Sequence, residues 1–368
     1  MKKILFVATV DIHIINFHLS VIKKLTKLGY IIDVASNGTY TNEDINQKYN
    51  VCFSKDPFSL DNITAYFKIK EIAKKNNYDI ISCHTPLSSF FTRLACRKLK
   101  STKIFYTAHG FHFFKGCPLI NKLVYKNMEK IAARYTDLLI TINNEDYLES
   151  LNFKLKVNGL CMHIPGVGVD ISKIINAKAN SQKLRKELNI SDDDIVILSV
   201  GELNNNKNHI IVLEGLLDKF LCNKNLKYYI CGVGGKKDDY IKFINQYKLN
   251  DQILLLGYRN DICDIYHLAN IFIFPSKREG LPVSLMEALA TGIISIATDV
   301  RGNRDLITDG VNGFLIKNNS KEDLLEKFNK VTKLSSIEHK KICENAKNSM
   351  LIYEKNAIEN QILELYTY

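Results

Sequence analysis

Short apolar runs rich in Ile, Val and Leu recur along this chain of 368 residues, each followed by a longer stretch with helical spacing. The runs are continuous rather than alternating, which is typical of strands buried on both faces of a parallel sheet. They form two series. The first comprises Ile4–Thr9, Ile31–Ala35, Ile80–Cys83, Ile104–Ala108 and Leu138–Ile142, and the second Ile195–Val200, Tyr228–Cys231, Ile253–Leu256, Ile271–Phe274, Ile293–Ala297 and Phe314–Ile316.

Two such series predict an α/β protein with two doubly wound, Rossmann-like domains that face a cleft. A turn-rich stretch at Pro165–Asp170 separates them, so we predict a first domain over residues 1–165 and a second over 166–345. Residues 346–368 have a helical pattern. This helix could simply cap the second domain, but we predict that it packs back toward the first. Ligands of such sheets bind beyond the carboxyl ends of the strands, so we expect the site in those loops.

The formal net charge of +11 is concentrated in the first half of the chain. Residues 1–165 hold 23 Lys/Arg and 13 Asp/Glu, whereas residues 166–368 hold 27 and 26. This asymmetry indicates that the first half meets an anionic partner, with nucleic acid, a membrane face and a phosphorylated substrate as candidates. The basic residues are interleaved with aromatic ones, which favours an anionic membrane surface over an ordinary solvated helix face.

Other features of the composition indicate a cytoplasmic protein. The nine cysteines are dispersed and form no C-x-x-C pair, which is typical of reduced thiols. No stretch approaches the ~18 continuous apolar residues of a membrane span, so we expect any membrane contact to be peripheral, on the inner face of the cell membrane. The start of the chain imitates a signal peptide but has no small-residue cleavage site, and we interpret it as a buried strand.

Two glutamates, Glu279 and Glu287, form the strongest candidate site, directly after the predicted strand Ile271–Phe274. Pro282 suits the first position of a helix, which places Glu279 in the preceding loop and Glu287 in the second turn. Gly280 allows a ligand to approach the backbone, and the free N–H groups of a helix start favour an anion. The segment thus offers amides to phosphates and carboxylates to hydroxyls. The spacing alone also fits a helix-capping and a surface glutamate.

A second candidate loop follows the predicted strand Ile195–Val200. Gly201 at the strand end can present an amide, and Lys207 an ammonium group, to a phosphate. Lys207 alone also fits a solvated loop cation.

The histidines carry no metal-ligand spacing. His13, His18, His84 and His112 are interpreted mainly as structural or hydrogen-bonded residues, although His13 and His112 lie on candidate cleft loops. The D-x-D spacing at Asp192–Asp194 precedes a strand rather than following one, which indicates a solvated turn. We therefore expect neither a metal nor a cofactor.

With these features the sequence resembles glycosyltransferase family 4, the retaining sugar-nucleotide transferases of the GT-B fold. The resemblance rests on Glu279-x7-Glu287, the Gly201/Lys207 loop and the helix continuation Ala288–Gly292. Residues Thr107–Gly116 and Leu139–Asn143 closely resemble the branch that builds bacterial capsule, exopolysaccharide and lipid-linked glycans. The resemblance runs from Met1 through the C-terminal helix.

The resemblance implies roles for residues of both domains. Glu287 is expected to bind the ribose of the nucleotide, and Glu279 to lie near hydroxyls of the donor sugar. His109 is expected to face that sugar across the cleft and to be catalytic together with Lys207 and Glu279. The donor nucleotide, its diphosphate and its base are expected to contact a larger set, namely Gly201, Lys207, Tyr258, Arg259, Glu279, Gly280, Leu281, Pro282, Val283 and Glu287.

The sequence departs from the family pattern in two places. Glu202 stands where most members have Arg, so Lys207 is expected to matter more, or Arg278 or Arg259 to compensate. The first βα loop, Thr9–Asn16, lacks the Gly-Gly pair of many members, so acceptor predictions from better-known relatives do not transfer.

The resemblance predicts metal-independent, retaining transfer of a sugar from a nucleotide donor, UDP-hexose or UDP-N-acetylhexosamine. The expected acceptor is a lipid-diphosphate-linked saccharide of bacterial surface polysaccharide synthesis. One alternative is a sugar-nucleotide epimerase or hydrolase of the same architecture, which would need no acceptor. The other is a basic nucleic-acid-binding protein, and the lack of a nucleic-acid motif counts against nucleic acid as a partner.

Overall fold

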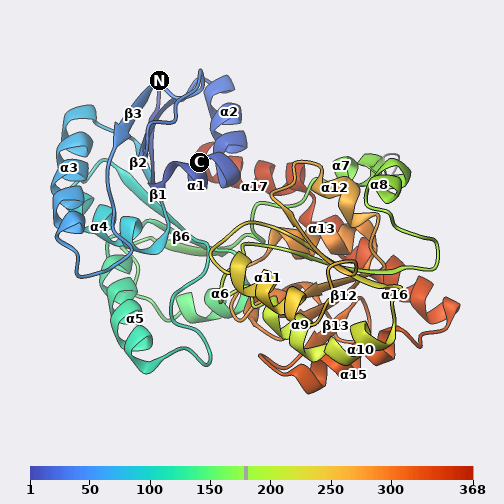
Figure 1. Ribbon diagram of the computed structural model, residues 1–368. Coiled ribbons are helices and arrows are strands. Elements are labelled where there is room, and N and C mark those ends of the chain that lie inside the picture. The colour runs from blue at the N-terminus through green and yellow to red at the C-terminus, as the bar shows by residue number, and fades with distance from the viewer. Residues whose placement is uncertain (178–180, 368) are drawn as a thin grey trace. The chain divides into compact units, whose positions relative to one another are not determined.

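The computed structural model describes residues 1–177 and 181–367. The chain forms two compact units, each built around its own parallel sheet (Figure 1). Unit 1 comprises Met1–Val167 together with Ala357–Tyr368, and unit 2 comprises Gly168–Asn356. The first boundary thus lies two residues beyond the predicted one at Pro165.

Unit 1 contains a seven-stranded parallel sheet in the order β3-β2-β1-β4-β5-β6-β7. Each apolar run of the first series falls on one of these strands. The two edge strands, β3 and β7, were not predicted, because their short sequences are polar or only half-buried. The strands are β1 (Lys3–Val10), β2 (Ile31–Asn37), β3 (Gln47–Asn50), β4 (Ile80–His84), β5 (Lys103–Ala108), β6 (Leu138–Thr141) and β7 (Leu160–His163).

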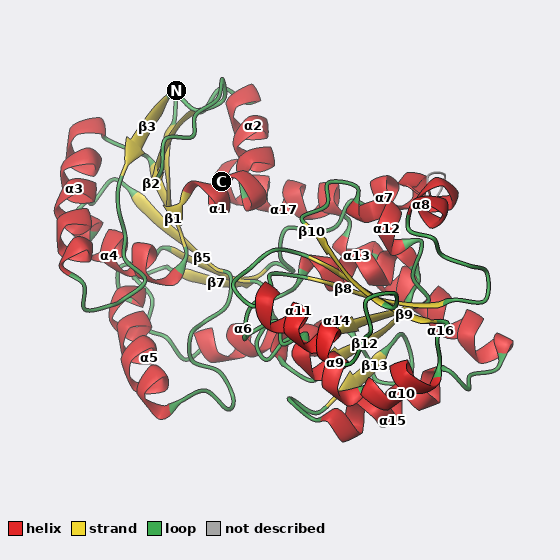
Figure 2. Cartoon of the chain, viewed as in Figure 1, coloured by secondary structure: helices red, strands yellow, loops and turns green. Residues whose placement is uncertain are grey.

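Helices cover both faces of this sheet, which explains why its strands are apolar throughout (Figure 2). Alternate residues of β1 enter different cores: Leu5 and Val7 pack on one face, and Ile4 and Phe6 on the other. The first core is covered by α3 (Leu60–Asn76), α4 (Pro86–Cys96) and α5 (Leu119–Ala133). The second is covered by α1 (Asp11–Phe17), α2 (Leu19–Lys27) and α17 (Lys355–Thr367), while α6 (Asn144–Ser150) follows β6.

The C-terminal helix α17 is an integral part of unit 1. The Tyr366 hydroxyl lies 2.6 Å from Ser82 Oγ in β4, and the Lys24 ammonium lies 2.6 Å from the Glu359 carboxylate. Residues 346–356 belong to unit 2, so the predicted C-terminal segment 346–368 starts too early. Its first residues are the end of α16 (Ser336–Ser349), which packs on the core of unit 2 through Ile342.

Unit 2 contains a six-stranded parallel sheet in the order β10-β9-β8-β11-β12-β13, and the two sheets together confirm the predicted α/β class. Its strands are β8 (Ile195–Val200), β9 (Leu226–Cys231), β10 (Ile253–Gly257), β11 (Ile271–Phe274), β12 (Ile294–Thr298) and β13 (Phe314–Ile316). Its helices, besides α16, are α7 (Ile171–Ala177), α8 (Ser181–Glu187), α9 (Ile210–Gly215), α10 (Leu217–Cys222), α11 (Lys237–Gln246), α12 (Ile262–Tyr266), α13 (Val283–Thr291), α14 (Arg301–Leu306) and α15 (Lys321–Val331).

The cysteines and the possible membrane spans were considered over both units. All nine cysteines are free thiols in the structure, as expected. Within the described residues, no helix combines the length and the apolar character that crossing a membrane requires.

Candidate active site

The predicted site residues of unit 2 lie at the topological switch point of its sheet. The strand order reverses between the neighbouring strands β8 and β11, and ligands of open α/β sheets bind beyond the carboxyl ends of the strands at such a point. Gly201 and Lys207 lie in the loop after β8, and Glu279 and Gly280 in the loop after β11. The fold therefore brings together two loops that are about seventy residues apart in the chain.

Lys207 and Glu279 form an ion pair in these loops. Lys207 Nζ lies 2.6 Å from Glu279 Oε1, and the two side chains are 20% and 11% exposed. The ammonium group also lies 4.7 Å from the centre of the Phe274 ring. Partial burial strengthens such contacts relative to those of a fully solvated lysine. Lys207 is therefore a positioned cation.

Two asparagines, which sequence reasoning passed over, hold the loops. Asn204 Oδ1 accepts hydrogen bonds from the backbone N–H groups of Asn206 and Lys207, both at 2.9 Å. Asn206 then links the second loop: its Nδ2 donates to the Arg278 carbonyl at 3.0 Å, and its own carbonyl accepts from the Lys277 N–H at 2.8 Å. The run of asparagines at residues 204–206 was the available signal, because Asn side chains favour such local backbone hydrogen bonds.

Gly201 packs closely against Lys207. A Cβ at this position would lie 3.1–3.3 Å from the methylene carbons of Lys207, so the lysine side chain would have to shift slightly to admit a larger residue. Its neighbour Gly232 has a φ of +150°, and a Cβ there would lie 1.9 Å from the Gly201 carbonyl oxygen. Glu202, the residue that departs from the family pattern, is exposed.

The helix that follows Glu279 begins one residue later than predicted. Pro282 is the N-cap of α13, with ψ of 119°, and the helix starts at Val283. No side chain of the described residues caps this end. Because proline has no N–H, Pro282 offers no amide to a phosphate, which corrects the predicted amide set at Leu281–Val283. Leu281 and Val283 remain as donors, together with the following residues of the first turn.

Arg301, at the start of α14, supports the same loop and was not singled out from the sequence. It is 5% exposed, and its Nε donates a hydrogen bond of 2.9 Å to the Glu279 carbonyl oxygen. Its position after β12, the strand beside β11, was the signal that could have identified it.

Glu287 lies in the second turn of α13, as predicted. The Tyr266 hydroxyl, which has a single hydrogen to donate, lies 3.0 Å from both Glu287 Oε2 and the Ser284 carbonyl oxygen. Burial raises the pKa of Glu287 above its usual range, and the hydrogen bond from Tyr266 opposes this rise. The carboxylate is thus half-buried and oriented by one phenol.

The residues predicted to contact the base follow β10. Tyr258 is 77% exposed, so its ring is available for stacking. Arg259 makes two hydrogen bonds to the Asp261 carboxylate, at 2.8 and 2.6 Å, and this pairing raises the pKa of Arg259. Its guanidinium group is therefore already engaged by a carboxylate of its own loop, which weakens the expectation that it compensates for Glu202.

His109 belongs to unit 1 and lies directly after β5. It joins His13, His18 and His84 in a histidine cluster, in which one ring nitrogen of each residue lies within 4.8 Å of the others. The sequence interpretation of His13, His18 and His84 as mainly structural residues did not include their proximity to one another and to His109. Sequence spacing missed the cluster because its members follow three different strands.

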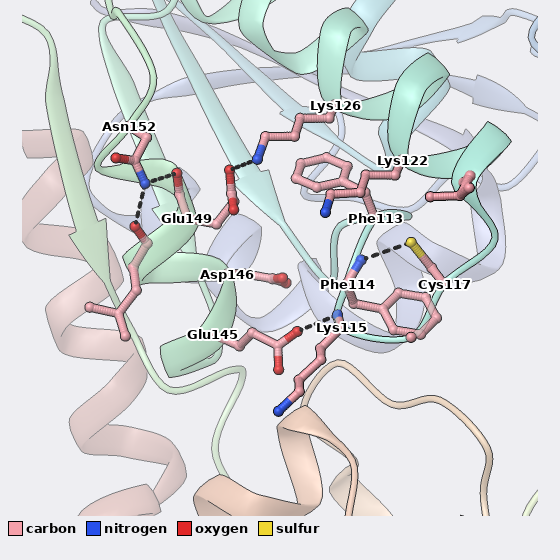
Figure 3. A pocket seen from close by; sticks show the side chains of 13 residues that line it. Phe113, Phe114, Lys115, Cys117, Lys122, Lys126, Glu145, Asp146, Glu149 and Asn152 are labelled. Carbon is pink, nitrogen blue, oxygen red and sulfur yellow. Dashed lines mark hydrogen bonds and ion pairs between the residues drawn. The ribbon is translucent and has the colours of Figure 1, made fainter.

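Unit 1 also contains a pocket of about 670 Å³ near the start of α5 (Figure 3). Lys115, Lys122 and Lys126 reach it from the loop after β5 and from α5. Lys126 Nζ lies 2.6 Å from Glu149 Oε1, whereas in the described part of the chain Lys115 and Lys122 make no ion pair. Glu145 accepts a hydrogen bond from the Lys115 backbone N–H at 3.0 Å.

Two protein-family models match the chain. The model described as glycosyl transferases group 1 matches residues 180–349, and the model described as glycosyl transferase 4-like matches residues 3–143. The two matches fall on units 2 and 1, respectively.

Known proteins resemble the chain over most of its length. It is 36% identical over 321 residues to EpsD of Bacillus subtilis (strain 168), which is named as a glycosyltransferase, covering 86% of this chain and 84% of that protein. It is 32% identical over 289 residues to the UDP-Gal:alpha-D-GlcNAc-diphosphoundecaprenol alpha-1,3-galactosyltransferase of Escherichia coli, covering 77% and 72%.

Solved structures share the fold. Anabaena Alr3699/HepE, in complex with UDP and glucose, superposes with a TM-score of 0.78 over the whole of both chains at 19% identity. WaaG, a glycosyltransferase involved in lipopolysaccharide biosynthesis, superposes with a TM-score of 0.77 over 99% of both chains at 15% identity.

Proposed function

Because the chain belongs to glycosyltransferase family 4 and has its two Rossmann-like sheets, we propose that it transfers a sugar from a nucleotide donor to a lipid-diphosphate-linked saccharide. The reaction retains the anomeric configuration and serves the synthesis of a bacterial surface polysaccharide. The donor is a UDP-hexose or a UDP-N-acetylhexosamine. The E. coli relative supports this choice, since its name gives UDP-Gal as donor and a diphosphoundecaprenol-linked sugar as acceptor.

The Lys207–Glu279 pair at the switch point carries this proposal. Breaking the anomeric C–O bond of the donor leaves negative charge on the diphosphate. The Lys207 ammonium and the amides at the start of α13 can stabilise that charge without a metal ion at the phosphates. When Lys207 turns to phosphate oxygens, the Glu279 carboxylate is released to accept hydrogen bonds from hydroxyls of the donor sugar.

The proposed reaction needs no separate general base. The acceptor hydroxyl attacks the anomeric carbon on the same face from which the nucleoside diphosphate leaves. An oxygen of the leaving diphosphate takes the proton of the hydroxyl. In this scheme Glu287 binds the ribose, while Tyr258 and Arg259 border the base. The catalytic role of His109 stays a prediction.

The pocket of Figure 3 is the proposed site for the acceptor's diphosphate. Two carboxylates of the pocket already interact with other groups of the protein. Asp146 accepts a hydrogen bond of 3.0 Å from the Phe111 N–H, and Glu149 forms an ion pair with Lys126. The ammonium groups of Lys115 and Lys122 are then the cations that an anionic ligand would meet.

Two parts of unit 1 are proposed to contact the membrane: the basic residues at the ends of α3 and α4, namely Lys74, Lys75, Arg97 and Lys98, and the start of α5. Leu119, Ile120 and Leu123 are 62–77% exposed beside the pocket lysines. Exposed apolar side chains next to cations are typical of a helix that lies on an anionic lipid surface. The proposal therefore places the protein in the cytoplasm, at the inner face of the cell membrane.

The test is a panel of UDP-sugars incubated with a diphosphoundecaprenol-linked saccharide, followed by analysis of the product. We expect one donor to extend the acceptor with retained configuration, and nucleotide sugars to raise the melting temperature. Turnover of the nucleotide sugar at full rate without acceptor would show an epimerase or hydrolase instead. Tight, steeply salt-dependent binding of oligonucleotides, with no transfer, would favour the nucleic-acid alternative.

A further inference from the structure

The histidine cluster (His13, His18, His84 and His109) lies at the carboxyl edge of the sheet in unit 1. His13 is in α1, which directly follows β1, and His18 ends that helix. His84 is the last residue of β4, and His109 is the first residue after β5. Because β1, β4 and β5 are neighbours in the sheet, their carboxyl ends bring the four imidazoles together.

Each imidazole has a buried nitrogen that finds no hydrogen-bond partner among residues 1–177 and 181–367. These atoms are Nε2 of His13, His18 and His109, and Nδ1 of His84. A neutral imidazole has a lone pair on one ring nitrogen, which can bind a metal ion. Leaving a buried polar nitrogen unsatisfied is costly, and four in one place indicate a missing common partner.

The other nitrogen of His84 is held in a way that suits a ligand. His84 Nε2 lies 3.1 Å from Ser82 Oγ, which in turn lies 2.6 Å from the Tyr366 hydroxyl of α17. A proton on Nε2 leaves Nδ1 as the lone-pair donor toward the cluster. Outer hydrogen bonds of this kind orient the histidine ligands of metal ions.

There is space beside the rings. A cavity of about 20 Å³ is lined by His18, His84 and His109, and this volume admits about one water-sized particle. The other walls of the cavity are mainly apolar and include Val21, Ile140 and Ile362.

We propose that the histidine cluster binds one transition-metal ion, Zn²⁺ in the first place. Neutral imidazole is a preferred ligand of Zn²⁺, and four protein ligands without an open position are typical of a structural zinc site. Zn–N bonds of about 2.0–2.1 Å place tetrahedral ligand nitrogens about 3.4 Å apart. The present spread of up to 4.8 Å closes to that value by small rotations, for which partly exposed His13 and His109 have the most room.

The ion would fasten the first βα loop to the ends of β4 and β5. It has no part in the proposed chemistry at the donor diphosphate, which rests on residues of unit 2. In this proposal His109 Nε2 is a metal ligand. Any contact of His109 with the donor sugar is then made by its other ring nitrogen or by its backbone.

The first experiment measures metal binding by the full chain without a histidine tag. After treatment with EDTA and removal of the chelator, ZnCl₂ is titrated by calorimetry, and bound zinc is counted by elemental analysis. We expect saturation at one ion per chain and a higher melting temperature. Co²⁺ in the same site should give the intense visible absorption of a tetrahedral complex. Absence of a saturable one-to-one site would overturn the proposal.

Variants assign the site to the cluster. His13→Gln, at a partly exposed position that should tolerate substitution, removes one ligand, and Ser82→Ala removes the outer hydrogen bond. We expect Ser82→Ala to weaken zinc binding about 10–100-fold and His13→Gln to weaken it further. His163→Gln is the matched control, since His163 in β7 also has a buried, unpartnered Nε2 but lies outside the cluster. Equal zinc affinity in His13→Gln and His163→Gln would refute the assignment.

These measurements use no sugar and no acceptor. Loss of transfer activity therefore cannot imitate their result, and failure to bind zinc leaves the proposed transferase function intact.

Discussion

Lys207 is positioned by contacts of three kinds. Asn204 holds its backbone N–H, Glu279 pairs with its ammonium group at 2.6 Å, and the Phe274 ring lies 4.7 Å below that group. A lysine fixed in this way loses less side-chain entropy on meeting a ligand than a solvated one does. This arrangement favours a binding role over the solvated-cation alternative that the loop sequence left open.

We predict that Lys207→Ala lowers kcat about 10²–10³-fold, because it removes the main cation proposed to stabilise the leaving diphosphate. Lys277→Ala is the matched control, an exposed lysine of the neighbouring loop. Steady-state kinetics of both variants, with circular dichroism to verify folding, decide the question. Near-normal turnover by a folded Lys207→Ala protein would remove Lys207 from the mechanism.

His209, just beyond Lys207, makes stability depend on pH. Burial lowers its pKa from 6.5 to about 4, and the charge of Lys207 contributes in the same direction. Between these values the unfolded chain binds a proton that the folded chain does not. The free energy of unfolding should therefore fall as the pH drops from 6.5 to about 4, by about 3 kcal/mol from this residue.

Urea unfolding across this pH range measures the effect. His209→Gln should make the dependence shallower by the contribution of this one residue, whatever its effect on stability at neutral pH. His339→Gln, an exposed histidine of α16, should leave the dependence unchanged. Parallel pH curves for wild type and His209→Gln would contradict the assignment.

Among the secondary-structure elements, the start of helix α13 differs by one residue from the start that the sequence predicts. Pro282 predicts a helix beginning, and the structure has one there, but as the N-cap rather than the first turn. A shift of one residue changes which backbone N–H groups are available to an anion. The pattern therefore locates the binding element, and the backbone geometry selects its donors.

The loop after β5 and the start of helix α5 should together determine acceptor affinity. We predict that Lys115→Ala/Lys122→Ala raises KM for the lipid-diphosphate acceptor about tenfold or more and leaves the Kd for the UDP-sugar unchanged. The reason is that the two ammonium groups are proposed to contact only the acceptor's diphosphate. Lys130→Ala, an exposed lysine at the other end of α5, is the control. Equal increases in the donor Kd and the acceptor KM would show that the pocket is not a binding site for the acceptor alone.

At the scale of the whole molecule, the charge follows the two units. The C-terminal segment brings Glu359 and Glu364 into unit 1, which then holds 23 Lys/Arg and 15 Asp/Glu, against 27 and 24 in unit 2. The basic excess of unit 1 is thus +8 rather than the +10 of residues 1–165. It still exceeds that of unit 2, which contains the proposed donor site, so a separate anionic partner remains its best explanation.

We predict that reversing Lys74, Lys75, Arg97 and Lys98 to Glu weakens binding to anionic liposomes more than about 100-fold. Each of these exposed cations contributes about 1 kcal/mol near such a surface. Cosedimentation with liposomes measures the effect, and UDP-sugar affinity should not change. Reversal of four exposed lysines of unit 2, Lys237, Lys333, Lys340 and Lys341, is the control. Unchanged liposome binding in the first variant would assign the charge to an ordinary solvated face.

Local sequence patterns were enough to predict the buried strands of both sheets, the α/β class and the two loops that carry Lys207 and Glu279. Apolar runs, turn residues and helix-start signals act between near neighbours in the chain, so one sequence contains them in full. The edge strands β3 and β7 were not predicted, because they bury too little surface to require an apolar run in the sequence.

Contacts between residues that are distant in the chain depend on the packing of the strands and helices. The strand order β2-β1-β4-β5 brings the four histidines of unit 1 together, and the order β8-β11-β12 brings Arg301 to Glu279. The last turns of the chain likewise join unit 1 through Tyr366. Strand order depends on how whole elements pack against one another, and no local pattern of residues contains it.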